Sequence, residues 1–239
     1  MDDFAAIAPP LSPPVLIEQF WGELTFIHWP VDPATIEHLY PVGTRPDVFE
    51  GGLTYIGLVP FVMQRTALAR KVPLPYFGAF AETNVRLYSV DSAGRRGVVF
   101  RSLETERLAV VGLTRLGLGV PYTWAKMRVA RTADRIAYAS VRRWPRRGLR
   151  NMLEIAIGEP VQPTPLEVWL TARWGAHTRK AGRTWWVPNE HATWPLHTAE
   201  VVALHDDLVA AGGVVPAGPP LRALFSPGVQ ARFGRPVVI

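Results

Sequence analysis

The segment from Phe80 to Leu103 constrains the fold more than any other part of the sequence. Over Phe80–Val90 (FAETNVRLYSV) two sets of side chains alternate, which is typical of a β-strand because successive side chains point to opposite faces. A DSAG turn follows, and Gly97–Leu103 (GVVFRSL) predicts the partner strand of a hairpin. The first strand has one face with Thr83, Val85, Leu87 and Ser89 and another with Glu82, Asn84, Arg86 and Tyr88.

More strands and a few short helices follow from similar patterns. Pro60 lies inside the run Leu53–Met63, which indicates an edge strand or a bulge. The other predicted strands are Phe20–Trp29, Lys126–Ala130, Ile136–Val141, Asn151–Ile157 and Thr178–Val187. The predicted helices are Asp32–Leu39, Glu104–Leu116, Pro165–Trp174 and Thr198–Ala211, the last having the clearest apolar spacing. Many strands with turns between them indicate a mainly β barrel or sandwich decorated by short helices.

Lysine is scarce and cysteine is absent, which limits the chemistry. The 239 residues include 26 Lys and Arg, of which only Lys71, Lys126 and Lys180 are lysines. Without cysteine there is no disulfide, no Cys-ligated zinc or iron–sulfur site and no thiol nucleophile. A mechanism that needs a lysine amine therefore has three candidates.

The net charge of +6 is concentrated in one segment, Arg142–Arg150 (RRWPRRGLR), which has five arginines and no acid. It is either a contact for an anionic partner or a solvated loop between two strands. Nucleic-acid binders usually spread basic residues over a face, so we expect the loop and no nucleic-acid partner. No window approaches the ~18 apolar residues of a membrane span, and the first residues lack a basic secretory signal, so we expect a cytoplasmic protein without a membrane partner.

The common catalytic signatures are absent. The sequence has no P-loop, no G-x-S-x-G and no H-E-x-x-H, and Gly117-Leu118-Gly119 lacks the third glycine of a dinucleotide fingerprint. His191 and His197 are six residues apart, which suits neither one helix face nor a zinc loop. We expect no metal and no cofactor.

The polar face of the Phe80–Val90 strand is the remaining candidate site. If this face meets water, Glu82, Asn84 and Arg86 are solvated residues without a specific role. If it faces an interior, they form a ligand-binding set, because buried charges need partners. Arginine then offers a planar fork for a carboxylate, and a buried glutamate can serve as general acid or base.

Seven segments follow one another along the chain. They are HWPV from His28, GGLTYIGLVPF from Gly51, FAETNVRLY from Phe80, GVVFRSLET from Gly97, LGLGVPYTWAKM from Leu116, PLEVWLTARW from Pro165 and HATWPL from His191. Together, and in this order, they resemble the bacterial YqjF-like proteins of the acetoacetate decarboxylase-like superfamily. The resemblance begins near Gln19 and continues to the C-terminus. It implies a single domain over 19–239, folded as a cone-shaped β-barrel with an internal cavity that the polar face lines, and we expect the proline-rich residues 1–18 to form an arm before it.

The resemblance also implies a mechanism that this sequence does not match. Acetoacetate decarboxylases form a Schiff base on a lysine that follows a Gly-aromatic-Pro segment and lies beside a second lysine. Here Gly119-Val120-Pro121 is followed by Tyr122 and Thr123, which form no iminium, and the nearest amine belongs to Lys126. Glu82 matches the strand glutamate of the family. Lys126 is therefore either a substitute for the family lysine or a surface residue.

Five other residues are candidates to line the cavity. Arg173 could anchor an anion or pair with Glu82 or Glu167, and His191 lies in a turn-rich segment with Trp194. The five are His28, Arg115, Tyr122, Arg173 and His191.

Three functions stay open. The first is an enzyme acting on a carboxylate or keto acid, with Arg86 or Arg173 holding the anion and Glu82 moving a proton. The second is a non-catalytic binding protein that uses the same cavity. The third is an interaction protein that works through the loop Arg142–Arg150. Catalysis, ligand identity and oligomeric state are left open by the sequence.

Overall fold

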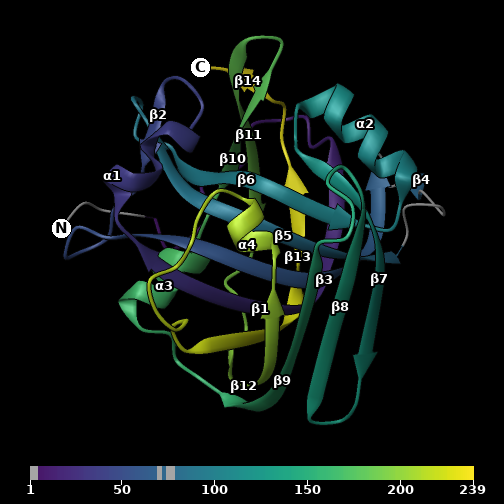
Figure 1. The fold of residues 1–239 in the computed structure, drawn as a ribbon. Helices are drawn as coiled ribbons and strands as arrows, with labels where there is room; N and C mark the ends of the chain where they lie inside the picture. The colour runs from purple at the N-terminus through teal and green to yellow at the C-terminus, as the bar shows by residue number, and fades with distance from the viewer. Residues whose placement is uncertain (1–4, 69–71, 74–78) are drawn as a thin grey trace.

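The structure, a computed structural model, describes residues 5–68, 72–73 and 79–239, and in these ranges fourteen strands form one sheet. The mainly β fold is confirmed (Figure 1). The strands are β1 (Ile17–Val31), β2 (Thr44–Pro46), β3 (Thr54–Leu68), β4 (Val72–Pro73), β5 (Ala79–Asp91), β6 (Arg96–Thr105), β7 (Tyr122–Arg131), β8 (Arg135–Trp144), β9 (Arg150–Pro160), β10 (Gly175–Lys180), β11 (Arg183–His191), β12 (His197–Asp206), β13 (Ala223–Phe233) and β14 (Val237–Val238). The helices are α1 (Pro33–Ile36), the 3-10 helix η1 (Glu37–Leu39), α2 (Leu108–Leu118), α3 (Pro165–Thr171) and α4 (Leu208–Ala211).

The sheet closes on itself in two ways. The first ring runs β5–β6–β7–β8–β9–β12–β13–β1–β3 and returns to β5. A second ring leaves β6 through β10 and β11 and rejoins the sheet at β13. Both rings share β6, β5, β3, β1 and β13, so each shared strand has a side toward each ring.

The alternation in β5 separates these two interiors. Val85 and Leu87 pack with Ile136 of β8 and Leu153 of β9, so this face of β5 points into the first ring. Tyr88 lies on the opposite face and packs with Val98, Trp169 and Leu170 beside the second ring. Both faces of β5 are buried, so its alternating polar and apolar side chains face two different interiors and neither set faces water.

Helix α3 begins where its sequence predicts. The Thr164 side chain accepts a hydrogen bond from the Glu167 backbone N–H, and the Glu167 side chain accepts from the Thr164 backbone N–H, which forms a capping box. Arg222 also donates to Glu167, at 2.6 Å. These contacts fix α3 over the second ring. No helix in the described ranges is long and apolar enough to cross a membrane.

The helix predicted over Thr198–Ala211 is wrong. The segment forms the strand β12 followed by the single turn of α4. β12 pairs with β9 and with β13, and these pairings close the first ring. A register shift between Val201 and Ala203 brings apolar residues to a spacing that resembles a helix, so tertiary pairing overrode the local pattern.

Two other strand predictions need correction. The segment Thr178–Val187 is not one strand but parts of β10 and β11, which meet at a turn over residues 181–182. β3 is not an edge strand, because it lies between β1 and β5. Pro60 does lie at an irregularity, since the β1–β3 register breaks between Gly22 and Ile27 and leaves the proline nitrogen free of ladder pairing on that side.

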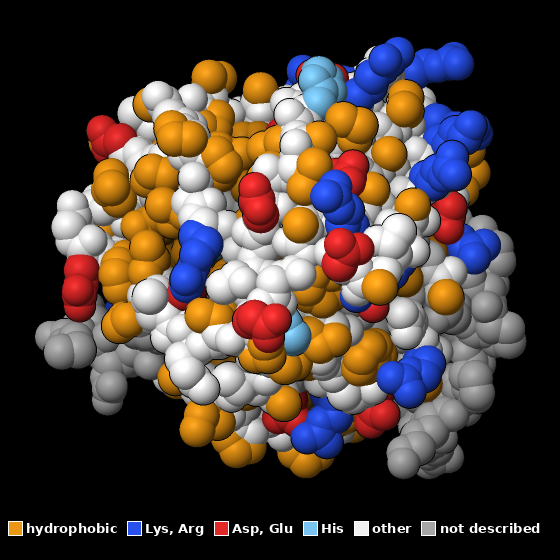
Figure 2. All heavy atoms as spheres, turned by 90° about the horizontal axis from the view of Figure 1, so that it is seen from below, with side chains coloured by type: hydrophobic (Ala, Val, Ile, Leu, Met, Phe, Trp, Pro, Cys, Tyr) orange, Lys and Arg blue, Asp and Glu red, His pale blue; other side chains and the backbone are white. Residues whose placement is uncertain are grey.

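The basic segment Arg142–Arg150 is only partly a loop. Arg142 lies near the C-terminal end of β8. Its Nε donates to Glu104 at 2.6 Å, and both side chains are buried. Ser140 also donates to Glu104, at 2.5 Å. The face in Figure 2 mixes acidic and basic side chains, with Lys and Arg gathered along one edge of that view. One of the five arginines is therefore an internal counterion rather than part of a surface patch.

Replacing Arg142 tests the value of this buried pair. Arg142→Met leaves the Glu104 carboxylate buried without its cation, so we expect the free energy of unfolding to fall by about 3–5 kcal/mol. The exposed Arg143, whose guanidinium lies 5.0 Å above the Trp124 ring, is the matched control, and Arg143→Met should cost less than about 1 kcal/mol. Urea denaturation measures both. Equal losses in the two variants would contradict the assignment, and adding Glu104→Gln to Arg142→Met should recover part of the loss.

Candidate functional site

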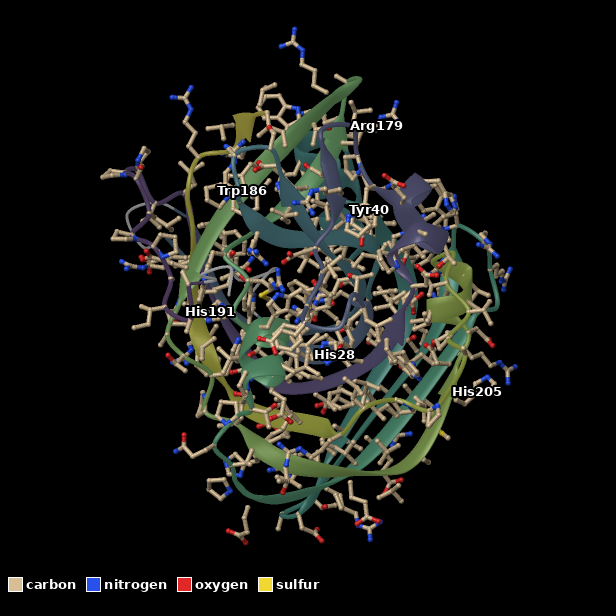
Figure 3. All side chains as sticks on the ribbon, turned by 90° about the vertical axis from the view of Figure 1, so that its left-hand side faces the viewer. His28, Tyr40, Arg179, Trp186, His191 and His205 are labelled. Atoms are coloured by element: carbon tan, nitrogen blue, oxygen red, sulfur yellow. The ribbon has the colours of Figure 1, made fainter. Side chains whose placement is uncertain are left out.

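The polar face of β5 meets β1, β3, β11 and α3 inside the second ring, a region called here the second interior. Glu82 and Asn84 are buried and Arg86 is partly buried, so the solvated alternative for this face does not apply. Opposite these residues on β3 lie Phe61, Val59 and Gly57. Figure 3 shows His28 at the centre of the molecule beside α3, and His191 on β11.

His28, Tyr88 and Arg86 form a hydrogen-bonded group with the end of α3. The Tyr88 hydroxyl lies 2.7 Å from His28 Nε2 and 3.0 Å from the Leu170 carbonyl oxygen. Arg86 Nη2 donates to the same carbonyl at 3.1 Å and lies 3.3 Å from the Tyr88 hydroxyl. Burial, and then the charges of Arg86 and Arg173, hold the pKa of His28 well below its usual value, so His28 is neutral.

Gly57 provides the space for this group. It pairs directly with His28 on β1 and with Arg86 on β5. A Cβ atom at Gly57 would lie 3.0 Å from His28 Cδ2 and 3.4 Å from Arg86 Cγ. The glycine therefore lets the imidazole and the arginine stem lie side by side over β3.

Arg86 has no carboxylate partner among the described residues. Its guanidinium lies 5.7 Å from the Phe26 ring centroid and 5.6 Å from that of Tyr88, and its Nε is buried without an acceptor. Asn84, two residues away on the same face, has a buried Oδ1 without a donor. The second interior therefore contains a positive charge and unused hydrogen-bonding atoms on neighbouring side chains.

Arg173 has a different role from the two that the sequence suggested. It pairs with Asp47 rather than with Glu82 or Glu167, and its Nε donates to the Trp169 carbonyl at 2.9 Å. Asp47 follows β2, and β2 pairs with the end of β5. This pairing places the Asp47 carboxylate beside Arg173, just after α3. Arg173 retains one buried nitrogen, Nη2, without an acceptor.

Glu82 and Tyr122 form a second polar group in the same interior. The Tyr122 hydroxyl donates to Glu82 Oε2 at 2.8 Å. Burial raises the pKa of Glu82 to about 8, although the hydrogen bond from Tyr122 lowers it, and burial also raises the pKa of Tyr122 well above its usual value. Glu82 therefore carries a proton at neutral pH and can donate or accept one near pH 8.

His191 belongs to an aromatic wall of this interior. Its ring centroid lies 4.7 Å from those of Trp174 and Trp194, and 5.8 Å from that of Trp21. Burial, and more weakly the charge of Arg86, lower the pKa of His191 to about 4. The dependence on Arg86 indicates that the wall lies near the guanidinium.

The described lysines do not contribute to this region. Lys126 is exposed on β7, because its neighbour Ala125 is the residue buried in the first ring. Lys180 donates to the Gly117 carbonyl at the surface, and Lys71 lies outside the described residues. Arg115 likewise stays outside, since it donates to the Tyr122 backbone carbonyl at 2.8 Å and holds the start of β7.

Sequence reasoning did not assign roles to Tyr88, Gly57 or Asp47. Tyr88 continues the alternation Glu82, Asn84, Arg86, so its position was visible in the sequence. The contacts of Gly57 and Asp47 depend on strand register and on the position of α3, which no local pattern shows. The described residues contain no group of three or more His, Asp or Glu that could hold a metal.

Comparison with known proteins identifies relatives along most of the chain. The model of the DUF2071 family, described as an uncharacterized conserved protein, matches residues 18–230. The uncharacterized protein YqjF of Bacillus subtilis is 30% identical over 211 residues, which cover 86% of each chain. The resemblance inferred from the sequence segments is confirmed.

Solved structures with the same fold are acetoacetate decarboxylase-like. An acetoacetate decarboxylase-like enzyme from Sphingomonas wittichii RW1 has a TM-score of 0.65 and 11% identity, and the match covers 95% of this chain and 94% of that one. The enduracididine biosynthesis enzyme MppR, complexed with the condensation product of pyruvate and imidazole 4-carboxaldehyde, has a TM-score of 0.65 and 14% identity over 98% of this chain and 91% of that one. At these identities the likeness shows the fold alone.

Adding one methyl group at Gly57 tests the packing of the His28–Tyr88–Arg86 group. We expect Gly57→Ala to lower the free energy of unfolding by about 1–3 kcal/mol, because the Cβ displaces His28 or Arg86. Gly112→Ala is the control, since Gly112 lies in α2 with nothing within 4 Å, and it should raise stability by about 0.5–1 kcal/mol. Urea denaturation and the His28 imidazole NMR shifts report the outcome. An unchanged His28 spectrum in Gly57→Ala would refute this role of the glycine.

The raised pKa of Glu82 predicts a pH dependence of stability. The folded protein keeps a proton on Glu82 up to pH about 8, whereas the unfolded chain releases it near 4.5. Stability should therefore fall as pH rises through this window, by up to about 1.4 kcal/mol per pH unit from this group. Glu82→Gln removes the contribution, so the variant should gain on the wild type as pH rises. Glu154, which is partly exposed and pairs with Arg135 at the surface, is changed to Gln as the control, and parallel profiles for Glu82→Gln and wild type would contradict the assignment.

Proposed function

The chain belongs to the DUF2071 family, and on this premise we propose that its second interior binds a small carboxylate of the keto-acid class and moves a proton on it. Arg86 would hold the carboxylate, and Glu82 with Tyr122 would move the proton. Asn84 would offer a further hydrogen bond to the ligand. His28 and Tyr88 would orient Arg86.

The observation that carries the proposal is Arg86 without an acid partner. The two deeply buried arginines of the described chain, Arg142 and Arg173, each pair with a buried acid, whereas the partly buried Arg86 does not. Leaving a buried guanidinium without an anion costs several kcal/mol, so a bound carboxylate would be stabilised there. The planar guanidinium also matches a carboxylate with two parallel hydrogen bonds.

Glu82 supports the proton transfer. A general acid or base works best when its pKa lies near the operating pH, and burial moves the pKa of Glu82 to about 8. Tyr122 donates to one oxygen of Glu82 and leaves the other free to exchange a proton with a substrate. This pairing resembles the division of roles in other enzymes, where environment rather than residue type assigns the acid.

The two positions that hold lysines in acetoacetate decarboxylases hold Tyr122 and Thr123 here, which argues against Schiff-base decarboxylation. Tyr122 occupies one of them and has a hydroxyl bonded to Glu82, while Thr123 donates to the Leu103 carbonyl at 3.3 Å. Lys126 is exposed on the outer side of β7. We therefore propose acid–base chemistry on a bound keto acid, such as enolisation, in place of an iminium.

Non-catalytic binding of the same ligand is the second candidate, and the same Arg86 observation supports it. The two differ in one respect only, which is whether Glu82 exchanges a proton with the ligand. An interaction through the loop Arg142–Arg150 has less support, because Arg142 is committed to Glu104.

Calorimetric titration of the protein with pyruvate, and separately with acetoacetate, tests the proposal. We expect saturable binding that Arg86→Met weakens roughly 10- to 100-fold, since charge-assisted hydrogen bonds are lost. Arg86→Lys should recover part of this affinity, and Arg135→Met, on the surface beside Glu154, should leave it unchanged. Equal affinity of wild type and Arg86→Met would contradict the proposal.

Proton exchange in deuterated water then separates the enzyme from the binding protein. NMR should show deuterium entering the methyl group of pyruvate with wild type and not with Glu82→Gln, which should still bind. Binding without exchange in the wild type would favour the non-catalytic alternative. Borohydride should trap no adduct at Lys126.

A further inference from the structure

A surface recess of about 320 Å³ lies apart from the second interior, where η1, β6, the turn after α2 and β10 meet. Tyr40 and Arg179 both line it, and Figure 3 shows them in the same half of the molecule, away from His28 and His191. The lining residues that matter here are His38, Tyr40, Arg101, Gly119, His177 and Arg179.

The lining of this recess is basic. It includes two arginines and two histidines but no aspartate or glutamate. His177 contributes no charge, because burial lowers its pKa to about 4 while its ring nitrogens contact Ser89 Oγ at 2.8 Å and Asp91 at 3.4 Å. Asp91 is itself paired with Arg95 at 2.6 Å. The positive charge of the recess thus comes from Arg101 and Arg179.

Arg101 has backbone partners only. Its Nε donates to the Gly212 carbonyl at 2.8 Å and its Nη1 to the Leu39 carbonyl at 3.1 Å. No carboxylate contacts it within the described ranges, in contrast to Arg142 and Arg173. Burial lowers the pKa of Arg101, as expected for a guanidinium without a counterion. The two carbonyls hold the guanidinium plane in place without neutralising its charge.

Arg179 is exposed and its backbone is fixed against the end of α2. Gly119 ends α2 with φ +69°, and a Cβ atom there would lie 2.3 Å from the Arg179 carbonyl oxygen. Only glycine allows this close approach. The two arginines therefore project from elements of defined position on two sides of the recess.

We propose that this recess binds a small dianion, either a phosphate monoester or a dicarboxylate. Arg101 supplies a fixed, partly desolvated guanidinium, and Arg179 supplies a second charge at the rim. The volume suits a ligand smaller than a typical cofactor. The site is separate from the carboxylate site proposed around Arg86, so either can exist without the other.

Calorimetric titration of the full chain with inorganic phosphate and with succinate, at low ionic strength, tests the site. We expect saturable binding of at least one, and the preferred ion identifies the ligand class. Arg179→Gln should weaken it roughly 10-fold or more. Arg183→Gln is the matched control, because Arg183 is exposed on the same β10–β11 hairpin, pairs with Lys180 in the ladder and lies outside the recess.

Two further measurements keep the result interpretable. Arg101→Lys retains the positive charge but loses the planar guanidinium, so it should weaken the binding of phosphate or succinate. The thermal unfolding midpoint of this variant reports whether it still folds. Arg179→Gln should leave the affinity of the second interior for pyruvate unchanged, which separates the two sites. No saturable binding of either ion, or equal weakening by Arg179→Gln and Arg183→Gln, would overturn the proposal.

Discussion

The structure depends on the burial of β5 on both faces. A strand with both faces covered needs two separate sets of partners, and the forked edges of the shared sheet supply them: β7 and β10 both pair with β6, and β12 and β11 both pair with β13. The first ring encloses mainly apolar side chains of the largest core cluster. The second ring receives the polar face of β5, whereas the buried Arg142–Glu104 pair joins the strands β8 and β6.

Four arginines with buried or partly buried side chains fall into two kinds. Arg142 and Arg173 lie with acids brought by distant strands, which makes them parts of the fold. Arg86 and Arg101 are held by carbonyl oxygens instead, and these orient a guanidinium without neutralising it. Orientation without neutralisation is what a site for an anion requires, because the binding charge is then preorganised before the ligand arrives.

The sequence predicted the strands whose alternation or turns were strong and failed where pairing decided the structure. β5 and β6 were recognised from period two and the DSAG turn, and α3 lies within the helix predicted over Pro165–Trp174. The segment 198–211 failed, because a bulge in β12 imitates helical spacing and only its pairing with β9 reveals the strand. Glu82, Asn84 and Arg86 were identified as one face, whereas the partner of Arg173 was not, since Asp47 is brought to it by a contact across 126 residues.

The division of β5 between two interiors also bears on how such a chain can diverge. Even-numbered positions from 82 to 88 face the second interior, and Val85 and Leu87 between them pack in the first ring. Neighbouring codons of this strand therefore encode residues of two different interiors. Substitutions at every second residue would alter the second interior and leave the packing of the first ring in place.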